Sequence, residues 1–170
     1  ARVPRPNAIV LTYYSNDFDA LQRGQSPAPH GLLATVLQNS ALIDFIYWQV
    51  YRIAHADLGV AYWDSLRAAW NDTLLQKQHL EELTQISALA SDSATQFIVL
   101  LIPTLPAMET DKFIRDRVAE HLRAINVRVI DLEEAIASVP ANERVVSNVD
   151  HHPSKKVNQV IAEVLLREFQ

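Results

Sequence analysis

The chain has 170 residues, of which 49% are hydrophobic and 21% are charged, and its formal net charge is −5. This composition is typical of one globular domain with its own hydrophobic core, and the lack of a basic run argues against nucleic acid as a partner. Because the sequence has no cysteine, disulfides, thiolate zinc sites and a cysteine nucleophile are excluded.

Three short apolar runs predict buried β-strands. They span 8–13, 97–102 and 127–130, and Pro103 closes the second. The run 97–102 is far shorter than the roughly 20 residues needed to cross a bilayer, so we expect no transmembrane segment. The chain starts without a methionine, which favours a processed or truncated start, and its location (periplasmic, secreted or cytoplasmic) stays open.

Residues 18–63 follow the first predicted strand and contain a loop-like stretch and then a dense apolar helix over 32–53. An insertion at this place is either a lid or substrate wall, or a core helix with a long surface loop, and we favour the core helix. The aromatic residues of 45–70 are likewise expected mainly in the core, with an acyl or sugar pocket as the alternative; they are Phe45, Tyr47, Trp48, Tyr51, Tyr62, Trp63 and Trp70.

Apolar residues recur at helical spacing over 64–90, over 110–124 and after Pro153, where Ser154 or Asp150 is expected to cap the helix. Buried strands that alternate with helices predict an α/β fold, in which a parallel sheet has helices on both faces. Three strands are few for such a sheet, which usually has about five or six. We therefore expect additional polypeptide beside the first strand, whose apolar edge would otherwise stay unpaired.

The segment Tyr14-Ser15-Asn16-Asp17 directly follows the first predicted strand. Residues at the carboxyl end of a parallel strand are placed to touch a ligand. The alternative is that Asn16 and Asp17 cap the following turn through bonds to backbone N–H groups.

Asp150, His151 and His152 precede the last predicted helix and admit three interpretations. A carboxylate can orient an imidazole that acts as general base, and Pro153 keeps His152 out of the helical region, which suits such a turn. The three residues could instead bind a metal, but adjacent histidines on an extended segment point to opposite sides, so we expect neither a metal nor another cofactor. The third interpretation is that both histidines are solvated surface residues.

Taken together, PNAIVLTYYSNDF and VDHHPSKKVNQVIAEVL resemble two sequence blocks of the SGNH hydrolases, also called GDSL-type lipases and esterases. FIVLLIPTLP and INVRVIDLEEAI are similar to the fourth and fifth strands of that family. The resemblance covers nearly the whole chain. It implies a single SGNH-hydrolase-like domain over 1–170, incomplete at its N-terminus, with a flavodoxin-like parallel sheet and an insertion or lid at 18–63.

The resemblance also implies a role for each polar residue. Asn16 is similar to the asparagine of the oxyanion hole, and Asp17 to the structural aspartate beside it. His152 is similar to the general base and Asp150 to the residue that orients this base, with His151 as a spacer. We expect Asn16 and His152 to face one cleft, and Asp150 to accept a hydrogen bond from Nδ1 of His152.

The chain departs from the family pattern in three places. Tyr14 replaces a glycine, and the aspartate and histidine are spaced D-x-H where many members have D-x-x-H. The block with the nucleophilic serine and the block with a second oxyanion glycine have no counterpart, so the serine is expected upstream of Ala1. Ser15 adjoins Asn16 but occupies a spacer position, and we do not favour it as the nucleophile.

The resemblance predicts a serine ester hydrolase that acts on a small-molecule ester or an acylated carbohydrate, together with an N-terminal segment or fragment of the same protein. One alternative is a non-catalytic SGNH-like module that only binds such ligands. Another is a flavodoxin-like nucleotide binder, which is disfavoured because the three glycines are isolated and form no phosphate loop.

Overall fold

The computed structural model describes residues 6–22, 31–54, 58–92, 96–147 and 150–169. The elements in chain order are β1 (Ala8–Tyr14), the 3-10 helix η1 (Ser15–Gln22), α1 (Leu32–Asn39), α2 (Ala41–Ala54), α3 (Leu58–Trp70), α4 (Thr73–Asp92), β2 (Gln96–Ile102), α5 (Lys112–Ala124), β3 (Arg128–Asp131), α6 (Glu133–Ala137), the 3-10 helix η2 (Ala141–Glu143) and α7 (Lys155–Glu168). The three strands lie where the apolar runs predicted them.

The strands form one parallel sheet in the order β1-β2-β3. Ala8 pairs with Gln96 at one end of the β1–β2 register and Tyr14 with Ile102 at the other. β2 is therefore the central strand, and five of its seven residues are buried. The prediction of an α/β fold with a parallel sheet is confirmed, and this arrangement is compatible with a flavodoxin-like fold.

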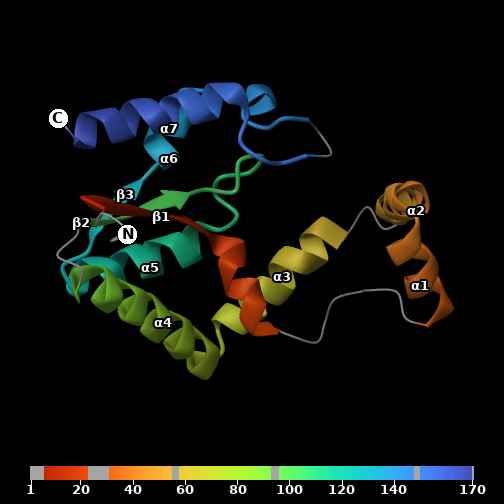
Figure 1. Ribbon diagram of the computed structural model, residues 1–170, viewed down its shortest axis with the longest axis horizontal. Helices are drawn as coiled ribbons and strands as arrows, with labels where there is room; N and C mark the ends of the chain where they lie inside the picture. The colour runs from red at the N-terminus through yellow and green to blue at the C-terminus, as the bar shows by residue number, and fades with distance from the viewer. Residues whose placement is uncertain (1–5, 23–30, 55–57, 93–95, 148–149, 170) are drawn as a thin grey trace, which may run out of the picture.

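Each face of the sheet is covered by a different set of helices (Figure 1). Alternate residues of β2 point to opposite faces, as the two-residue period of a strand requires. Ile98, Leu100 and Ile102 pack with α6 and α7. Val99 and Leu101 pack on the other face with residues of α3, α4 and α5. The two cores together hold the carboxyl ends of the three strands at one edge of the sheet.

One edge of β1 has no partner strand among the described residues. Ile9 on this strand is 36% exposed, whereas the central residues of β2 are fully buried. An open edge of this kind offers backbone N–H and C=O groups to another strand. The expectation that further polypeptide pairs here stays a prediction.

Two long helices predicted from the sequence are interrupted in the structure. The apolar stretch 32–53 forms α1 and α2, with a break at Ser40, and the pattern over 64–90 divides between α3 and α4. At the second break, the Asp72 carboxylate accepts hydrogen bonds from the backbone of Leu74 and Leu75, which caps α4. Apolar periodicity predicted the helical content correctly but not these local caps.

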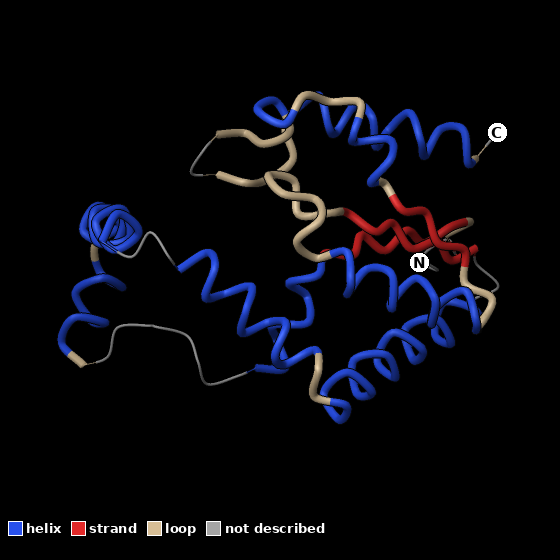
Figure 2. Tube along the Cα trace, turned by 180° about the vertical axis from the view of Figure 1, so that it is seen from behind, coloured by secondary structure: helices blue, strands red, loops and turns tan. Residues whose placement is uncertain are grey.

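The preferred interpretation of 32–53 as a core helix is wrong for most of its described side chains, although Leu37 is buried. α1 packs against α2, and the pair stands away from the sheet in both views (Figures 1 and 2). Phe45 is 60% exposed. The other exposed apolar residues of α1 and α2 are Leu32, Leu33, Val36, Leu42, Ile43, Ile46 and Val50.

None of the described helices is long and apolar enough to cross a membrane.

A buried tyrosine–histidine pair joins β1 to α4 beneath the sheet. The Tyr13 hydroxyl lies 3.0 Å from Nε2 of His79, and Phe18 and Trp70 meet the His79 ring edge-on. Burial lowers the pKa of His79, and the carboxylates of Glu82 and Asp17 offset this only in part. Burial also raises the pKa of Tyr13, so the tyrosine stays protonated and donates to a neutral imidazole.

Acidification is expected to destabilise the fold through His79. Because its pKa is lower in the folded state, protonation favours the unfolded chain, and stability falls as the pH drops below about 6.5 towards the folded value. His79→Gln keeps an acceptor for Tyr13 but cannot titrate. Urea midpoints near pH 7.5 and near pH 5.5 should differ less in this variant than in the parent protein.

The control for this prediction is His121→Gln, which alters a half-buried histidine that bonds to Thr84. This variant should still lose stability as the pH falls, since His79 is present. An unchanged pH dependence in His79→Gln would contradict the assignment.

Candidate functional site

Polar residues gather where the three parallel strands end. Ser15 and Asn16 follow β1, Thr104 lies two residues beyond β2, and Asp131 is the last residue of β3. Because the carboxyl ends of parallel strands share one edge of the sheet, these residues meet in space. This edge is the ligand-binding side of open α/β sheets in general.

Arg115 on α5 is fully buried and binds carboxylates from several segments. Its Nε lies 3.2 Å from Oδ1 of Asp111, its Nη1 lies 3.0 Å from both oxygens of Asp131, and its Nη2 lies 2.7 Å from Glu133. Nη2 also donates to the carbonyl of Met108 at 2.9 Å. One guanidinium thus ties the end of β3 to the loop that follows β2.

The charges of this cluster stabilise one another. Burial acts to lower the pKa of Arg115, but the hydrogen bond to Glu133 and the charges of Asp111 and Asp131 outweigh it, so the pKa is raised. Burial acts to raise the pKa of Glu133, and hydrogen bonds from Arg115 and Lys112 outweigh it in the opposite direction. Arg115 and Glu133 are therefore both charged at neutral pH.

Ser15 belongs to the same network. Its hydroxyl donates to Oδ2 of Asp111 at 2.7 Å, and the backbone N–H of Thr104 reaches Oδ1 of the same carboxylate at 3.3 Å. Ser15 is 2% exposed, so its Oγ is both buried and engaged. This geometry gives Ser15 a structural role in linking β1 to the loop after β2, in agreement with the view that it is a poor nucleophile.

Asp17 also has a structural contact. Its Oδ2 accepts a hydrogen bond from the backbone N–H of Tyr14 at 2.9 Å. The bond closes the turn from β1 into η1 and leaves Asn16 exposed between the two bonded residues. In the segment from Tyr14 to Asp17, hydrogen bonds hold Ser15 and Asp17 in place, and the Asn16 side chain between them is exposed to solvent.

Asp150 and His152 form a close pair on the loop before α7. Nδ1 of His152 lies 2.6 Å from Oδ1 of Asp150, which also accepts from the backbone N–H of His152 at 3.0 Å. The predicted contact is thus present. These bonds hold the pKa of Asp150 below its usual value. With Nδ1 turned to the carboxylate, Nε2 is the nitrogen left to exchange a proton with a ligand.

Backbone pairing holds this loop in place. Val145 and Pro153 form an antiparallel bridge, and the N–H of Val146 donates to the carbonyl of His152 at 3.0 Å. The hydroxyl of Ser154 then accepts from the N–H of Val157, so of the two predicted caps it is Ser154 that caps α7. The His152 side chain itself is 87% exposed, which suits a group that must reach a ligand.

Two neighbouring clefts open at this edge of the sheet. The histidine cleft has a volume of about 640 Å³ and is lined by Tyr14, Asn16, Asp17, Asp150, His151, His152 and Pro153. Asn16 and His152, 136 positions apart in the chain, therefore line the same cleft, as the sequence led us to expect. Tyr14, at the position compared above with a glycine of the SGNH hydrolases, forms part of its wall.

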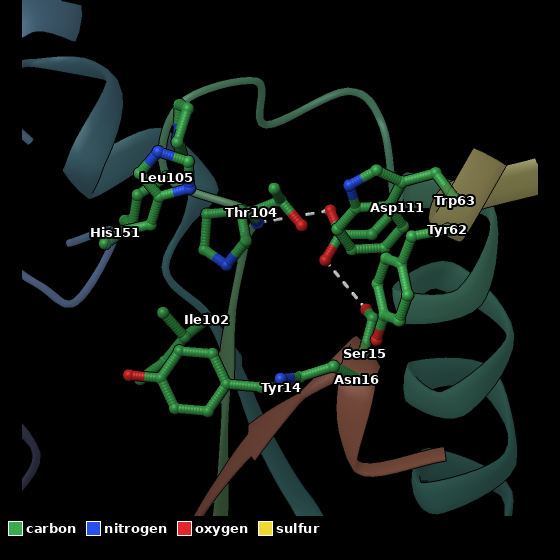
Figure 3. A pocket seen from close by; sticks show the side chains of 12 residues that line it. Tyr14, Ser15, Asn16, Tyr62, Trp63, Ile102, Thr104, Leu105, Asp111 and His151 are labelled. Atoms are coloured by element: carbon green, nitrogen blue, oxygen red, sulfur yellow. Dashed lines mark hydrogen bonds between the residues drawn. The ribbon is translucent and has the colours of Figure 1, made fainter. Parts of the chain in front are cut away.

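The aromatic cleft has a volume of about 500 Å³ and lies beside the first (Figure 3). It shares Tyr14, Asn16 and His151 with the histidine cleft but is not lined by His152. Figure 3 shows the Asn16 side chain reaching into this space beside the Tyr14 ring. The remaining lining residues are Ser15, Tyr62, Trp63, Ile102, Pro103, Thr104, Leu105, Pro106 and Asp111.

Sequence reasoning missed part of this edge. Tyr62 and Trp63 are half-buried and pack against the core, as expected, but they also line the aromatic cleft, whereas Trp70 is fully in the core. Arg115 was missed because its helix pattern predicts only the apolar face of α5. A charged residue beside that face gives no signal of burial until Asp111 and Asp131 are seen to converge on it.

Metal binding finds no support among the described residues, which contain no group of three histidine, aspartate or glutamate side chains placed to hold an ion. No protein-family model, curated protein or solved structure matches this chain.

Loss of the Arg115 guanidinium should destabilise the whole site. Arg115→Met leaves Asp111 buried without its counter-charge, and removing one partner of a buried ion pair typically costs roughly 3–5 kcal/mol. Arg117→Met is the matched control on the same helix, because Arg117 pairs with Glu120 at the surface, where such a pair contributes at most about 1 kcal/mol. Equal urea midpoints for the two variants would contradict the role of Arg115.

Proposed function

We propose that this chain carries the general base and an oxyanion donor of a serine ester hydrolase similar to the SGNH hydrolases. The substrate is a small-molecule acyl ester or O-acetyl ester. The proposal is carried by one observation: the Asp150–His152 pair, with 2.6 Å between carboxylate and Nδ1, lines the same cleft as Asn16. A base and an amide donor on one cleft are two of the parts that acyl transfer requires.

In the proposed first half-reaction, His152 acts as general base. Its Nε2 takes the proton of a serine hydroxyl as the serine oxygen bonds to the ester carbonyl carbon, and Asp150 stabilises the imidazolium that forms. The side-chain amide of Asn16 donates to the carbonyl oxygen as this oxygen becomes negative. Collapse of the intermediate breaks the bond to the alcohol oxygen, which leaves with the proton from His152.

In the second half-reaction, water replaces the alcohol. His152 takes a proton from the water as its oxygen attacks the acyl-enzyme, and then returns a proton to the serine oxygen as the carboxylic acid departs. Every proton transfer uses the same imidazole, so no metal or redox group enters the scheme. The exposure of His152 is consistent with the need for water to reach it.

The nucleophile of this proposal lies on polypeptide that pairs with the open edge of β1. Among the described residues, Ser15 is the one serine that lines either cleft, and its hydroxyl donates to Asp111. A strand added beside β1 would end at the same edge of the sheet, next to Asn16, if it ran parallel to β1. A serine at its carboxyl end would then face the histidine cleft.

The engaged Ser15 also favours the alternative function, a non-catalytic SGNH-like module that binds an ester or a sugar between Asn16 and His152. The two functions differ in the residue beside β1. A serine within reach of His152 supports the hydrolase, and its absence supports the binding module.

Removing the carboxylate of Asp150 should abolish most ester hydrolysis by the full-length natural protein. In Asp150→Asn the amide no longer holds the productive tautomer of His152, a change that costs about 10⁴-fold in turnover in serine proteases. The matched control is Glu143→Gln. It removes the charge of another surface carboxylate, which pairs with Lys156, and should leave turnover unchanged. Hydrolysis of p-nitrophenyl acetate measures both, and equal activity would refute the role of Asp150.

Asn16→Ala should lower kcat by roughly 10²–10³-fold with little change in KM, because an oxyanion donor acts mainly in the transition state. Its side chain is exposed, so the fold should tolerate the change. Steady-state kinetics on the same ester give both constants. A rise in KM at constant kcat would assign Asn16 to substrate binding alone.

A further inference from the structure

We propose that the aromatic cleft holds the acyl chain of the ester and the histidine cleft its alcohol, so that the site selects apolar acyl groups longer than acetyl. This inference deepens the proposed function and rests on it. It starts from the fact that two clefts, and not one, meet at Asn16.

The position of His152 indicates which cleft holds the alcohol and which holds the acyl chain. The group that accepts the serine proton must later give it to the alcohol oxygen, so the alcohol leaves on the side of His152. His152 lines the histidine cleft but not the aromatic cleft. Asn16 lines both, as a donor to the carbonyl oxygen between alcohol and acyl chain would. The acyl chain is thereby directed into the aromatic cleft.

The chemistry of the walls agrees with this assignment. Tyr62 and Trp63 from α3 meet edge-on at 5.4 Å between ring centres and face Ile102, Pro103 and Leu105 from β2 and the loop after it. An alkyl chain needs such a surface and offers no hydrogen bonds. Figure 3 shows the two aromatic side chains on the opposite side of the cleft from His151 and Leu105.

Several polar groups at the base of the aromatic cleft are already engaged. Ser15 donates to Asp111, and Asp111 also accepts from the N–H of Thr104 and from Arg115. A sugar placed here would find these groups committed to one another, and its buried hydroxyls would lose hydrogen bonds to water. The histidine cleft, by contrast, carries Asp17, Asp150 and two histidines, which suit a polar alcohol.

Linear carboxylates test the assignment without any turnover, because they are the acyl products of the reaction. Isothermal titration of the full-length natural protein with acetate, butyrate, hexanoate and octanoate should show affinity rising by roughly fourfold per methylene while the chain stays within the cleft. Methyl glucoside, a probe for sugar stacking on Trp63, should not displace octanoate, because any sugar is expected in the histidine cleft.

Two variants test whether the chain-length dependence arises in the aromatic cleft. Trp63→Ala should weaken octanoate binding at least about tenfold and leave acetate unchanged, and Thr104→Phe should fill the cleft and abolish the preference for long chains. Leu74→Ala is the control, because Leu74 is 74% exposed on α4 and lines neither cleft. Octanoate affinity equal to that of acetate, an unaffected Trp63→Ala variant, or displacement of octanoate by methyl glucoside would overturn the assignment.

The failure of this inference differs from the failure of the proposed function. A protein that binds octanoate with the predicted chain-length dependence but hydrolyses no ester contradicts the hydrolase and leaves the acyl-binding cleft in place. A protein that hydrolyses p-nitrophenyl acetate and octanoate esters equally well, and binds carboxylates without regard to length, contradicts the acyl assignment alone.

Discussion

The buried guanidinium of Arg115 is the interaction on which the arrangement of this edge of the sheet depends. It joins Asp111, Asp131 and Glu133, and through Asp111 it reaches Ser15 at the end of β1 and the N–H of Thr104 beyond β2. Hydrophobic packing on the two faces of the sheet is non-directional and cannot by itself set the positions of strand ends. The charge-assisted bonds of Arg115 supply that direction.

The fixed strand ends give Asn16 its position. Asn16 lies between Ser15, whose hydroxyl is held by Asp111, and Asp17, which is bonded to the backbone of Tyr14. Asp150 and His152 are positioned independently, by the bridge between Val145 and Pro153 and by the pairing within their own turn. One side of the site thus depends on a buried ion cluster and the other on a short backbone ladder, and the clefts lie between them.

Much of this arrangement could be predicted from the sequence, for physical reasons. Apolar runs located the strands because a central parallel strand is buried on both faces, as β2 is. The pairing of Asp150 with His152 was expected from the resemblance to the SGNH hydrolases, and Pro153 permits the turn because it keeps His152 out of the helical region. Arg115 could not be predicted, because its burial depends on three carboxylates distributed over 23 positions (111 to 133) and on the sheet that brings them together. The exposure of Phe45 was missed because an apolar pattern indicates a helix and not what covers it.

The claim that His152 and Asn16 serve a serine beside β1 is tested most directly by covalent labelling of the full-length natural protein with a fluorophosphonate, followed by mass spectrometry of the labelled peptide. The account predicts one labelled serine, on a segment that pairs with β1, and loss of the label in His152→Ala. Labelling of Ser15 would contradict the structural role given to that residue, and the absence of any labelled serine would contradict the hydrolase itself.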